Sequence, residues 1–392
     1  MACALAISAT LAIAMAGEPA HAAATLEHAP YGTTQAGQAV EIFTLTNDRG
    51  LIVRFLSYGG VITEIRAPDR TGRSDNIVLG LRNLHDYETL SAHYGAITGR
   101  YANRIGNAQF TLDGQTYHLI ANNGVNSLHG GPNALDKQVW DVAATQVQNG
   151  VAATLSHVSK DGDQNFPGTL TTHVTYTLTN DNALRIDYLA TTDKHTVINF
   201  TNHSYFNLAG NGSGSVADQM LLVNAGRYTP SGADLIPTGE IAPVEGTPLD
   251  FRQMMPIGAR LNSAFQQMVN ARGYDHNFVL NQRPGETITF AARAYDPRTG
   301  RVIDCFTTEP GLQVYTSNGL NGSVVGSSGT TYRQTEAFTL ETQHYPDSPN
   351  KPNFPTTELQ PGQEFRSTTI FRFATDAPLP PLPPPLAPPP AR

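Results

Sequence analysis

The chain of 392 residues has few cysteines and few basic side chains. Its two cysteines are Cys3, which falls in an apolar N-terminal run, and Cys305. If that run is cleaved, one thiol remains and an internal disulfide framework is excluded. The stretch VIDCFTTE predicts that Cys305 is a small buried strand residue. The 25 basic residues form no cluster and are outnumbered by 33 acidic ones. Because nucleic-acid binding needs a basic surface, we expect no nucleic-acid partner.

The apolar run at the N-terminus is too short to cross a membrane. It extends from Cys3 to about Ala16 and is followed by small residues around Ala20-His21-Ala22. An apolar core followed by such a site is typical of a secretory signal peptide, although no Lys or Arg precedes the core. We therefore expect residues 1–24 to be a signal peptide. The mature protein would be periplasmic or secreted, with no membrane insertion after cleavage. An alanine-rich disordered N-terminus is the alternative.

Helical periodicity is weak, and the best short helix candidate is around Asn262–Gln267. The chain has 35 glycines and 27 prolines, which favours turns between short strands. Apolar and polar residues alternate in TLTTHVTYTLTN and again from Leu184 to Leu189, with the turn signal Asn-Asp-Asn between them. VEIFTL before Asn-Asp-Arg-Gly and QFTLDGQTYHL indicate further hairpins. We predict an all-β fold, a large antiparallel β-sandwich forming a single domain over residues 25–375.

Proline dominates the end of the chain, in the run APLPPLPPPLAPPP. Proline has no backbone N–H and favours extended, solvated structure. We expect residues 376–392 to form a disordered tail or spacer, and a ligand for a proline-binding module is the less favoured alternative.

Cofactor and nucleophile signatures are missing from the sequence. No glycine-rich nucleotide-binding loop, H-E-x-x-H helix or G-x-S-x-G elbow is present. The twelve histidines show no paired metal-ligand spacing. Any chemistry must therefore rest on side chains that the fold brings together.

Five polar stretches combine His, Asn, Arg or an acid with glycine and aromatic residues. They are GRYANRI (99–105), NSLHGG (126–131), TNHSYFNL (201–208), GYDHNFVL (273–280) and LETQHYPDSPN (340–350). Alternation in AFTLETQ directs Glu341 away from the face of Phe338 and Leu340. The same pattern in GLQVYTSNG places Gln313, Tyr315 and Ser317 together. Such polar strand faces can line a sugar cleft.

Each of these residues also has a simpler interpretation. His203 can be a core histidine, Arg104 a solvated charge, Asp275 a turn residue, His129 a loop residue and Glu341 a surface ion-pair partner. Taken singly, the simpler interpretations are favoured. Their combination in one chain favours a shared site.

Together the stretches resemble the aldose 1-epimerase, or galactose mutarotase, family. TNHSYFNL, NSLHGG, GRYANRI, DHNF and LETQ–PD all occur in the family's order, from about Gly95 to Asn350, and Leu135–Trp140 resembles a further family segment. The resemblance implies a β-sandwich with an open cleft. It also implies interconversion of the α and β anomers of free aldohexoses without a metal or an organic cofactor, so the expected cofactors are none and the partner is a free monosaccharide.

The family's site residues carry over onto seven positions. The resemblance implies Glu341 as the base, His203 as the acid and His129 as the second histidine of the site. It implies that the sugar is held by four further residues, Asn103, Arg104, Asp275 and Gln313. Carboxylate and imidazole suit proton transfer near neutral pH.

Three other functions compete with this interpretation. A glycoside hydrolase could pair Asp275 with Glu341, but the two histidines would then be unexplained. A sugar-phosphate epimerase should show clustered basic residues. A non-catalytic carbohydrate-binding module has little need for an acid and a base together.

Overall fold

The computed structural model describes residues 23–90, 92–282 and 285–379. The predicted signal peptide lies outside the described residues except for its last two positions, and the proline-rich tail lies outside them from residue 380. Strand β1 begins at Thr25 and β29 ends at Thr375. Just beyond β29, Asp376 pairs with Arg70, with 2.9 Å between carboxylate and guanidinium. The predicted leader and tail both stay predictions.

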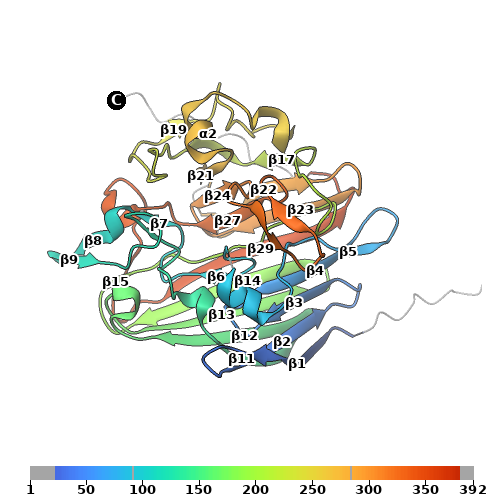
Figure 1. Ribbon diagram of the computed structural model, residues 1–392, viewed down its shortest axis with the longest axis horizontal. Coiled ribbons are helices and arrows are strands. Elements are labelled where there is room, and N and C mark those ends of the chain that lie inside the picture. Colours follow the sequence, from blue (N-terminus) through green and yellow to red (C-terminus); the bar gives the residue numbers. More distant parts are fainter. Residues whose placement is uncertain (1–22, 91, 283–284, 380–392) are drawn as a thin grey trace, which may run out of the picture.

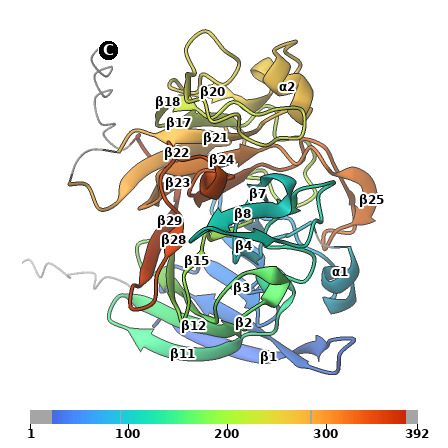
Figure 2. The same cartoon turned by 90° about the vertical axis from the view of Figure 1, so that its left-hand side faces the viewer.

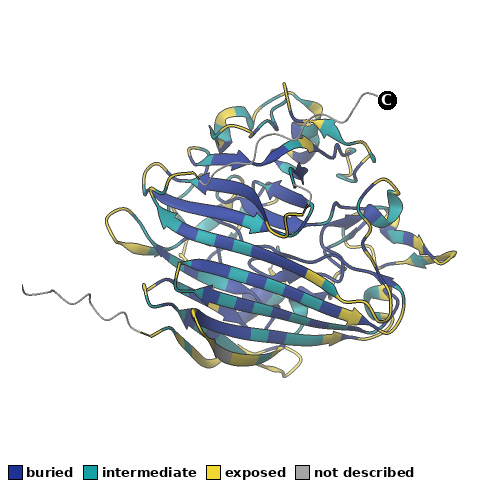
Figure 3. Cartoon of the chain, turned by 180° about the vertical axis from the view of Figure 1, so that it is seen from behind, coloured by how far each residue is buried: buried dark blue, intermediate teal, exposed yellow. Residues whose placement is uncertain are grey.

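A nine-stranded antiparallel sheet forms the largest layer of the molecule (Figure 1). Figure 3 shows its outward face, and buried and partly exposed residues alternate along central strands such as β13 and β14, as expected when one face packs on a core. In sheet order, its strands are β11 (Asp141–Val147), β12 (Gly150–Ser159), β13 (Leu170–Thr179), β14 (Ala183–Thr192), β29 (Phe365–Thr375), β23 (Arg301–Thr307), β22 (Thr289–Tyr295), β17 (Met220–Val223) and β20 (Met255–Pro256).

Two five-stranded sheets pack with the nine-stranded sheet around one hydrophobic cluster. In Figure 2, β1–β3 lie at the bottom beside β11 and β12, and β17–β24 lie toward the top. The first sheet contains β1 (Thr25–Thr33), β2 (Ala39–Thr46), β3 (Ile52–Leu56), β4 (Ile62–Pro68) and β5 (Ser74–Asn76). The second, in sheet order, contains β19 (Ala242–Pro243), β18 (Ala225–Tyr228), β21 (Asp275–Leu280), β24 (Gly311–Tyr315) and β27 (Thr339–Gln343).

The remaining elements are short and lie mainly in the connections. The paired strands are β6 (Ile97–Thr98) with β16 (Thr201–Asn202), β7 (Arg104–Ile105) with β10 (Ser127–Leu128), β8 (Gln109–Leu112) with β9 (Gln115–His118), β15 (Thr196–Val197) with β28 (Glu358–Leu359), and β25 (Asn321–Val325) with β26 (Thr331–Arg333). The helices are α1 (Leu84–Thr89) and α2 (Gln266–Ala271), and the 3₁₀ turns are η1 (Gly106–Ala108), η2 (Leu135–Lys137), η3 (Asp163–Asn165), η4 (Ile257–Arg260) and η5 (Ser348–Asn350).

The predicted all-β, single-domain fold and its hairpins are confirmed. Strands β13 and β14 pair antiparallel from Leu170↔Thr192 to Leu178↔Leu184. Strands β2 with β3 and β8 with β9 form the other two predicted hairpins. Cys305 is fully buried in β23, as predicted. Among the residues that the structure describes, no helix is both long and apolar enough to cross a membrane.

The predicted short helix is misplaced. Helix α2 begins at Gln266 and overlaps the predicted segment 262–267 in two residues. The reason is local, because the Ser263 hydroxyl accepts a hydrogen bond from the Phe265 N–H and so favours a turn ahead of the helix. Helix α1 was not predicted from the sequence. Its N-terminus is capped by Asn83, whose side chain accepts from the Asp86 N–H.

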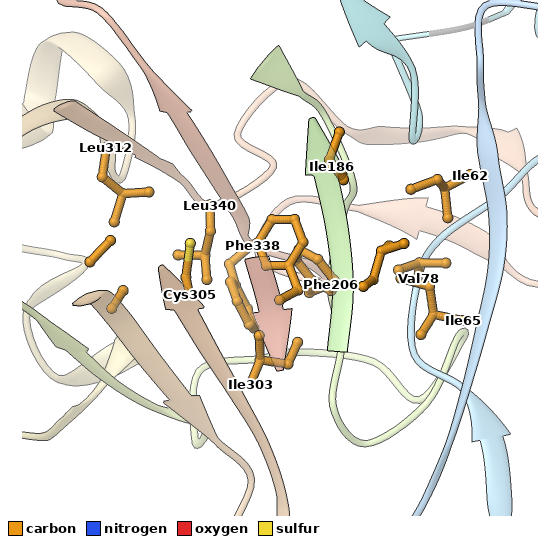
Figure 4. Packing of buried hydrophobic residues seen from close by; sticks show 14 of the residues in the cluster. Ile62, Ile65, Val78, Ile186, Phe206, Ile303, Cys305, Leu312, Phe338 and Leu340 are labelled. Atoms are coloured by element: carbon orange, nitrogen blue, oxygen red, sulfur yellow. The ribbon is translucent and has the colours of Figure 1, made fainter. Parts of the chain in front are cut away.

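Two phenylalanines join the two halves of the core (Figure 4). Phe206 and Phe338 lie between Cys305 on one side and Val78 on the other. Their backbones also form an isolated antiparallel bridge, with N···O distances of 2.7 Å and 3.0 Å. Packing and hydrogen bonding therefore fix the segment TNHSYFNL against strand β27, and this contact positions the site.

Candidate active site

Glu341 lies in the middle of β27, where the strand's alternation directs it away from the core. Phe338 and Leu340 belong to the hydrophobic core, as predicted for the opposite face. Glu341 is 2% exposed, and its Oε1 accepts a hydrogen bond of 2.8 Å from the Thr339 hydroxyl. Its Oε2 has no hydrogen-bond partner. A buried carboxylate oxygen without a partner is costly and often marks a functional site.

His203 follows β16 directly and is held by its backbone. Its N–H donates to the Ala96 carbonyl and its carbonyl accepts from the Gly95 N–H, both at 2.9 Å. The bridge between Phe206 and Phe338 sets the register of this segment against β27. His203 lies three residues before Phe206 and Glu341 three residues after Phe338, so this isolated antiparallel bridge brings the two residues to facing positions. The Nε2 of His203 lies 3.5 Å from the Oε1 of Glu341.

Burial shifts the proton affinity of both side chains of this pair. It raises the pKa of the Glu341 carboxyl to about 8, although the Thr339 hydrogen bond works in the other direction. Burial also lowers the pKa of His203 to about 3, and the neighbouring His93 lowers it further. Between these two values the pair holds one proton, and the free site keeps it on Glu341.

His129 lies beside His203, with the rings 5.1 Å apart and nearly perpendicular. Its Nδ1 accepts a hydrogen bond of 3.1 Å from the Asn103 N–H. Burial, followed by the neighbouring imidazoles and Arg104, holds the pKa of His129 well below its ordinary value. The ring is therefore neutral with its proton on Nε2, and Nε2 can donate to a ligand oxygen.

The same three side chains have the composition of a metal site. Ligand atoms of His129, His203 and Glu341 all lie within 4.8 Å of one another. A metal ligand must offer a lone pair, whereas the Asn103 hydrogen bond to Nδ1 leaves His129 with a proton on its other nitrogen. This arrangement fits a hydrogen-bond donor better than a metal ligand.

A polar chain of side chains lies on the other side of Glu341. Gln313 is paired with Glu341 across β24 and β27, and its Nε2 donates to Asp275 at 2.6 Å. Arg104 is 3.4 Å from the second oxygen of Asp275 and donates from its Nε to the Asn123 side chain at 3.2 Å. Fixed amide, carboxylate and guanidinium groups of this kind can bind sugar hydroxyls.

The backbones of the motifs GRYANRI and NSLHGG approach each other closely at Asn103, His129 and Gly130. Asn103 and His129 both have positive φ, at 61° and 51°, and the His129 N–H donates to the Asn103 carbonyl at 2.9 Å. Gly130 also has positive φ, and a Cβ there would lie 2.3 Å from the Gly99 carbonyl oxygen. Only glycine fits this position, so NSLHGG and GRYANRI can pack against each other.

The side chains of Glu341, His203, His129 and Arg104 surround a cleft of about 230 Å³. Six of the seven predicted residues line it, and Gln313 lies behind Asp275. Five further residues complete the lining, namely Ala92, His93, Leu128, Tyr205 and Tyr315. The volume is below the range of about 300–1,000 Å³ typical of drug-sized ligands, which suits a single sugar ring. A larger hollow of about 520 Å³ elsewhere has no histidine in its lining.

The sequence interpretation needs one correction at the cleft. Ser317 does not line it together with Tyr315, because β24 ends at Tyr315. The backbone then turns, with Ser317 at φ 52°, and its hydroxyl accepts the Ala337 N–H.

Two residues near the cleft were not assigned a role from the sequence. The Asp347 carboxylate accepts the Gly106 N–H, and its own N–H donates to the Arg104 carbonyl, so it fixes the backbone that carries Arg104. Asp347 belongs to the quoted stretch LETQHYPDSPN, which was a usable signal. His93 lines the cleft and contacts both other histidines, and no motif identified it.

Comparisons with known proteins agree with this architecture. The aldose 1-epimerase family model matches residues 41–372. The galactose mutarotase of Rattus norvegicus is 43% identical over 338 residues, covering 86% of this chain and 95% of its own. The aldose 1-epimerase of Escherichia coli is 37% identical over 343 residues, covering 87% of this chain and 97% of its own.

Solved structures give the same result. The galactose 1-epimerase from Lactobacillus acidophilus matches with a TM-score of 0.80 and 28% identity, covering 91% of this chain and 100% of its own. An aldose epimerase homologue from C. elegans matches with a TM-score of 0.76 and 26% identity, covering 90% of this chain and 99% of its own. Sequence, fold and the residues around the cleft thus lead to one assignment: the chain belongs to the aldose 1-epimerase family.

Proposed function

We propose that this protein is an aldose 1-epimerase that interconverts the α and β anomers of free aldohexoses such as galactose and glucose. The observation that carries the proposal is the buried Glu341–His203 pair, 3.5 Å apart at the cleft. Mutarotation needs one group that takes a proton from O1 and another that gives a proton to O5. A carboxylate and an imidazole in register can do both.

In the ring-opening half, Glu341 takes the proton of the anomeric hydroxyl while His203 protonates O5, and the C1–O5 bond breaks. Rotation about C1–C2 turns the other face of the aldehyde toward O5. In the closing half, Glu341 returns its proton to O1 and His203 recovers the proton from O5. The pair holds one proton throughout. It lies on Glu341 in the free site, moves to His203 when the sugar binds and before the ring opens, and is back on Glu341 before the ring closes.

The other predicted residues hold the sugar during this cycle. His129 donates from Nε2 to an oxygen near the ring oxygen. Arg104, Asn103 and Asp275 bind the remaining hydroxyls, and Gln313 fixes Asp275 by its hydrogen bond. Holding the open chain in this way keeps C1 and O5 close together for reclosure.

Two features of the lining disfavour the competing functions. Asp275 is tied to Arg104 and Gln313, which suits holding a sugar rather than acting as a glycosidase acid. Arg104 is the one arginine or lysine among the described lining residues, so a phosphate has no cluster of positive charge there.

Polarimetry of freshly dissolved α-D-galactose tests both the proposed activity and the assignment of Glu341 as the base. We expect the wild-type protein to accelerate equilibration and Glu341→Gln to lose at least ~10² in turnover. Glu336→Gln is a matched control, because Glu336 bonds the Arg333 N–H outside the cleft. Equal acceleration by wild type and Glu341→Gln would show that the base lies elsewhere. No acceleration with galactose, glucose, xylose or arabinose would overturn the proposed function.

We also propose that the protein is exported and acts on sugars before their uptake. The support is the N-terminal leader, whose apolar core and small-residue site occur together. Cell fractionation with N-terminal sequencing tests it. We expect a periplasmic or secreted form that begins near residue 25, and an uncleaved protein confined to the cytoplasm would contradict the proposal.

A further inference from the structure

A third histidine lines the cleft, and the reaction described above does not use it. His93 lies in the loop before β6, with a backbone φ of 63° that is unusual for a residue other than glycine. Its carbonyl accepts the Ala96 N–H at 3.0 Å, which closes a turn. Its side chain is 21% exposed, at the mouth of the cleft.

A buried carboxylate fixes the orientation of this ring. The Oδ2 of Asp136, in η2, lies 2.9 Å from the Nδ1 of His93. Asp136 is 4% exposed, and its Oδ1 has no hydrogen-bond partner. An ionised carboxylate can only accept, so Nδ1 of His93 is the donor. In the neutral ring, Nε2 on the other edge is then an acceptor.

His93 completes a group of three neighbouring imidazoles. Its ring centroid is 4.6 Å from that of His129 and 5.9 Å from that of His203. This group occupies one side of the cleft, whereas Asp275 and Gln313 occupy the side toward β21 and β24. Glu341 stands between the two sides.

The covalent structure of a pyranose places the sugar within this arrangement. C1 is bonded to O5 on one side and to C2 on the other. If Glu341 acts at O1 and His203 at O5, then C2 and its hydroxyl face Asp275. C5 and the exocyclic C6 hydroxyl follow O5, and therefore face the side formed by His203, His129 and His93.

We propose that His93 is a specificity-determining residue that accepts a hydrogen bond from the C6 hydroxyl of an aldohexose, and that Asp136 is the positioning residue that holds it there. The inference rests on the proposed function and names the feature of the substrate that the site selects. A pentose has no C6, and a 6-deoxyhexose has C6 without its hydroxyl. Both lose this hydrogen bond.

Three sugars separate this contact from the rest of the reaction. D-Galactose has the C6 hydroxyl, 6-deoxy-D-galactose lacks it, and L-arabinose has the same ring hydroxyls without C6. For the wild-type protein we expect kcat/KM to be about fivefold higher for galactose than for 6-deoxygalactose, the size of one neutral hydrogen bond. L-Arabinose should lose at least as much.

The deciding variants are His93→Phe and Asp136→Ala. Phenylalanine keeps an aromatic ring against His129 and removes both nitrogens, so the galactose to 6-deoxygalactose ratio should fall from about five to near one. Asp136→Ala should lower the same ratio part of the way, because the ring loses its fixed orientation. His93→Gln, which restores an acceptor, should recover part of the ratio.

His195→Phe is the matched control. The Nδ1 of His195 is 2.8 Å from Asp113, and its side chain is 16% exposed, but it lies outside the cleft. This variant should keep the wild-type ratio. Circular dichroism and melting temperature confirm that each variant is folded.

The outcomes distinguish this inference from the proposed function. If the wild type accelerates none of the three sugars, the proposed function fails, and this inference fails with it. If the wild type is active and His93→Phe lowers kcat/KM for all three sugars equally, then His93 has a structural role and the inference alone is overturned. A fall of the ratio confined to the His93 and Asp136 variants supports it.

Discussion

The hairpin of β13 and β14 and the wall of the cleft hold their backbones in different ways. In the hairpin, residue pairs follow one another without interruption from Leu170↔Thr192 to Leu178↔Leu184. The wall of the cleft that carries the histidines is built around two-residue strands such as β7, β10 and β16, and three of its residues have positive φ, namely His93, Asn103 and His129. The hairpin is held by many equivalent contacts, whereas the cleft is held by a few specific ones.

The two regions also differ in how their polar atoms are satisfied. In the hairpin, most polar side chains lie on the partly exposed face and can reach water, and the hydroxyls of Thr172 and Tyr188 are the buried exceptions without a hydrogen-bond partner. At the cleft, buried polar atoms of Glu341 and His203 have no hydrogen-bond partner, and the same holds directly behind its lining for Asp136 and Gln313. Such atoms reduce the stability of the fold, and active sites commonly carry this cost. Changes in the hairpin should therefore affect stability, and changes in the cleft should affect activity.

The largest expected effect comes from the cleft. His203→Asn should lower turnover by at least ~10², because the site loses its acid, while stability stays the same or rises. Polarimetry gives the rate and thermal unfolding gives the stability. Near-normal turnover in the folded variant would remove His203 from the mechanism.

The opposite result is expected in the hairpin. Ile186 is fully buried in β14, and Ile186→Ala should lower the free energy of unfolding by about 2–5 kcal/mol. Turnover per folded molecule should stay the same. Thr177→Ala, on the partly exposed face of β13, is the control and should cost less than about 1 kcal/mol. Denaturant unfolding measures both, and a large loss of turnover in folded Ile186→Ala would show that the two regions are coupled.

The pH dependence of kcat/KM tests where the free site keeps its proton. We expect a level profile at neutral pH and a fall of about tenfold per pH unit above about pH 8, after correction for spontaneous mutarotation. Above that pH, Glu341 loses the proton and the neutral His203 has none to give to O5. A fall that begins near pH 6.5 would show instead that His203 has its ordinary pKa in the free enzyme.

The smallest effect should come from the hydrogen bond on Glu341. Thr339 donates to the carboxylate at 2.8 Å and so lowers the pKa of Glu341. Thr339→Val keeps the shape and removes the donor, so the alkaline fall of kcat/KM should move up by about one pH unit. An unchanged profile would mean that Thr339 has no influence on the pair.

The sequence predicted the regular region better than the cleft, for physical reasons. The alternation of apolar and polar residues along a strand is a local signal. It was enough to predict the three hairpins and the direction in which Glu341 points. His93 could not be found in this way, because its placement depends on a left-handed turn and on Asp136, 43 positions away. The pKa shifts of Glu341 and His203 also required the structure, since they follow from burial. Ser317 was misplaced because alternation gives no sign of where a strand ends.

The facing positions of His203 and Glu341 limit how the sequences of such chains can change in evolution. Each residue lies three positions from the backbone bridge between Phe206 and Phe338. Inserting or deleting one residue between Phe338 and Glu341 would move Glu341 to the other side of β27, and the same change between His203 and Phe206 would move His203 away from its facing position. Substitutions in these spans can therefore accumulate one at a time, whereas a change in their length cannot. We therefore expect the spacing from His203 to Phe206 and from Phe338 to Glu341 to vary less among related chains than the residue types within these spans.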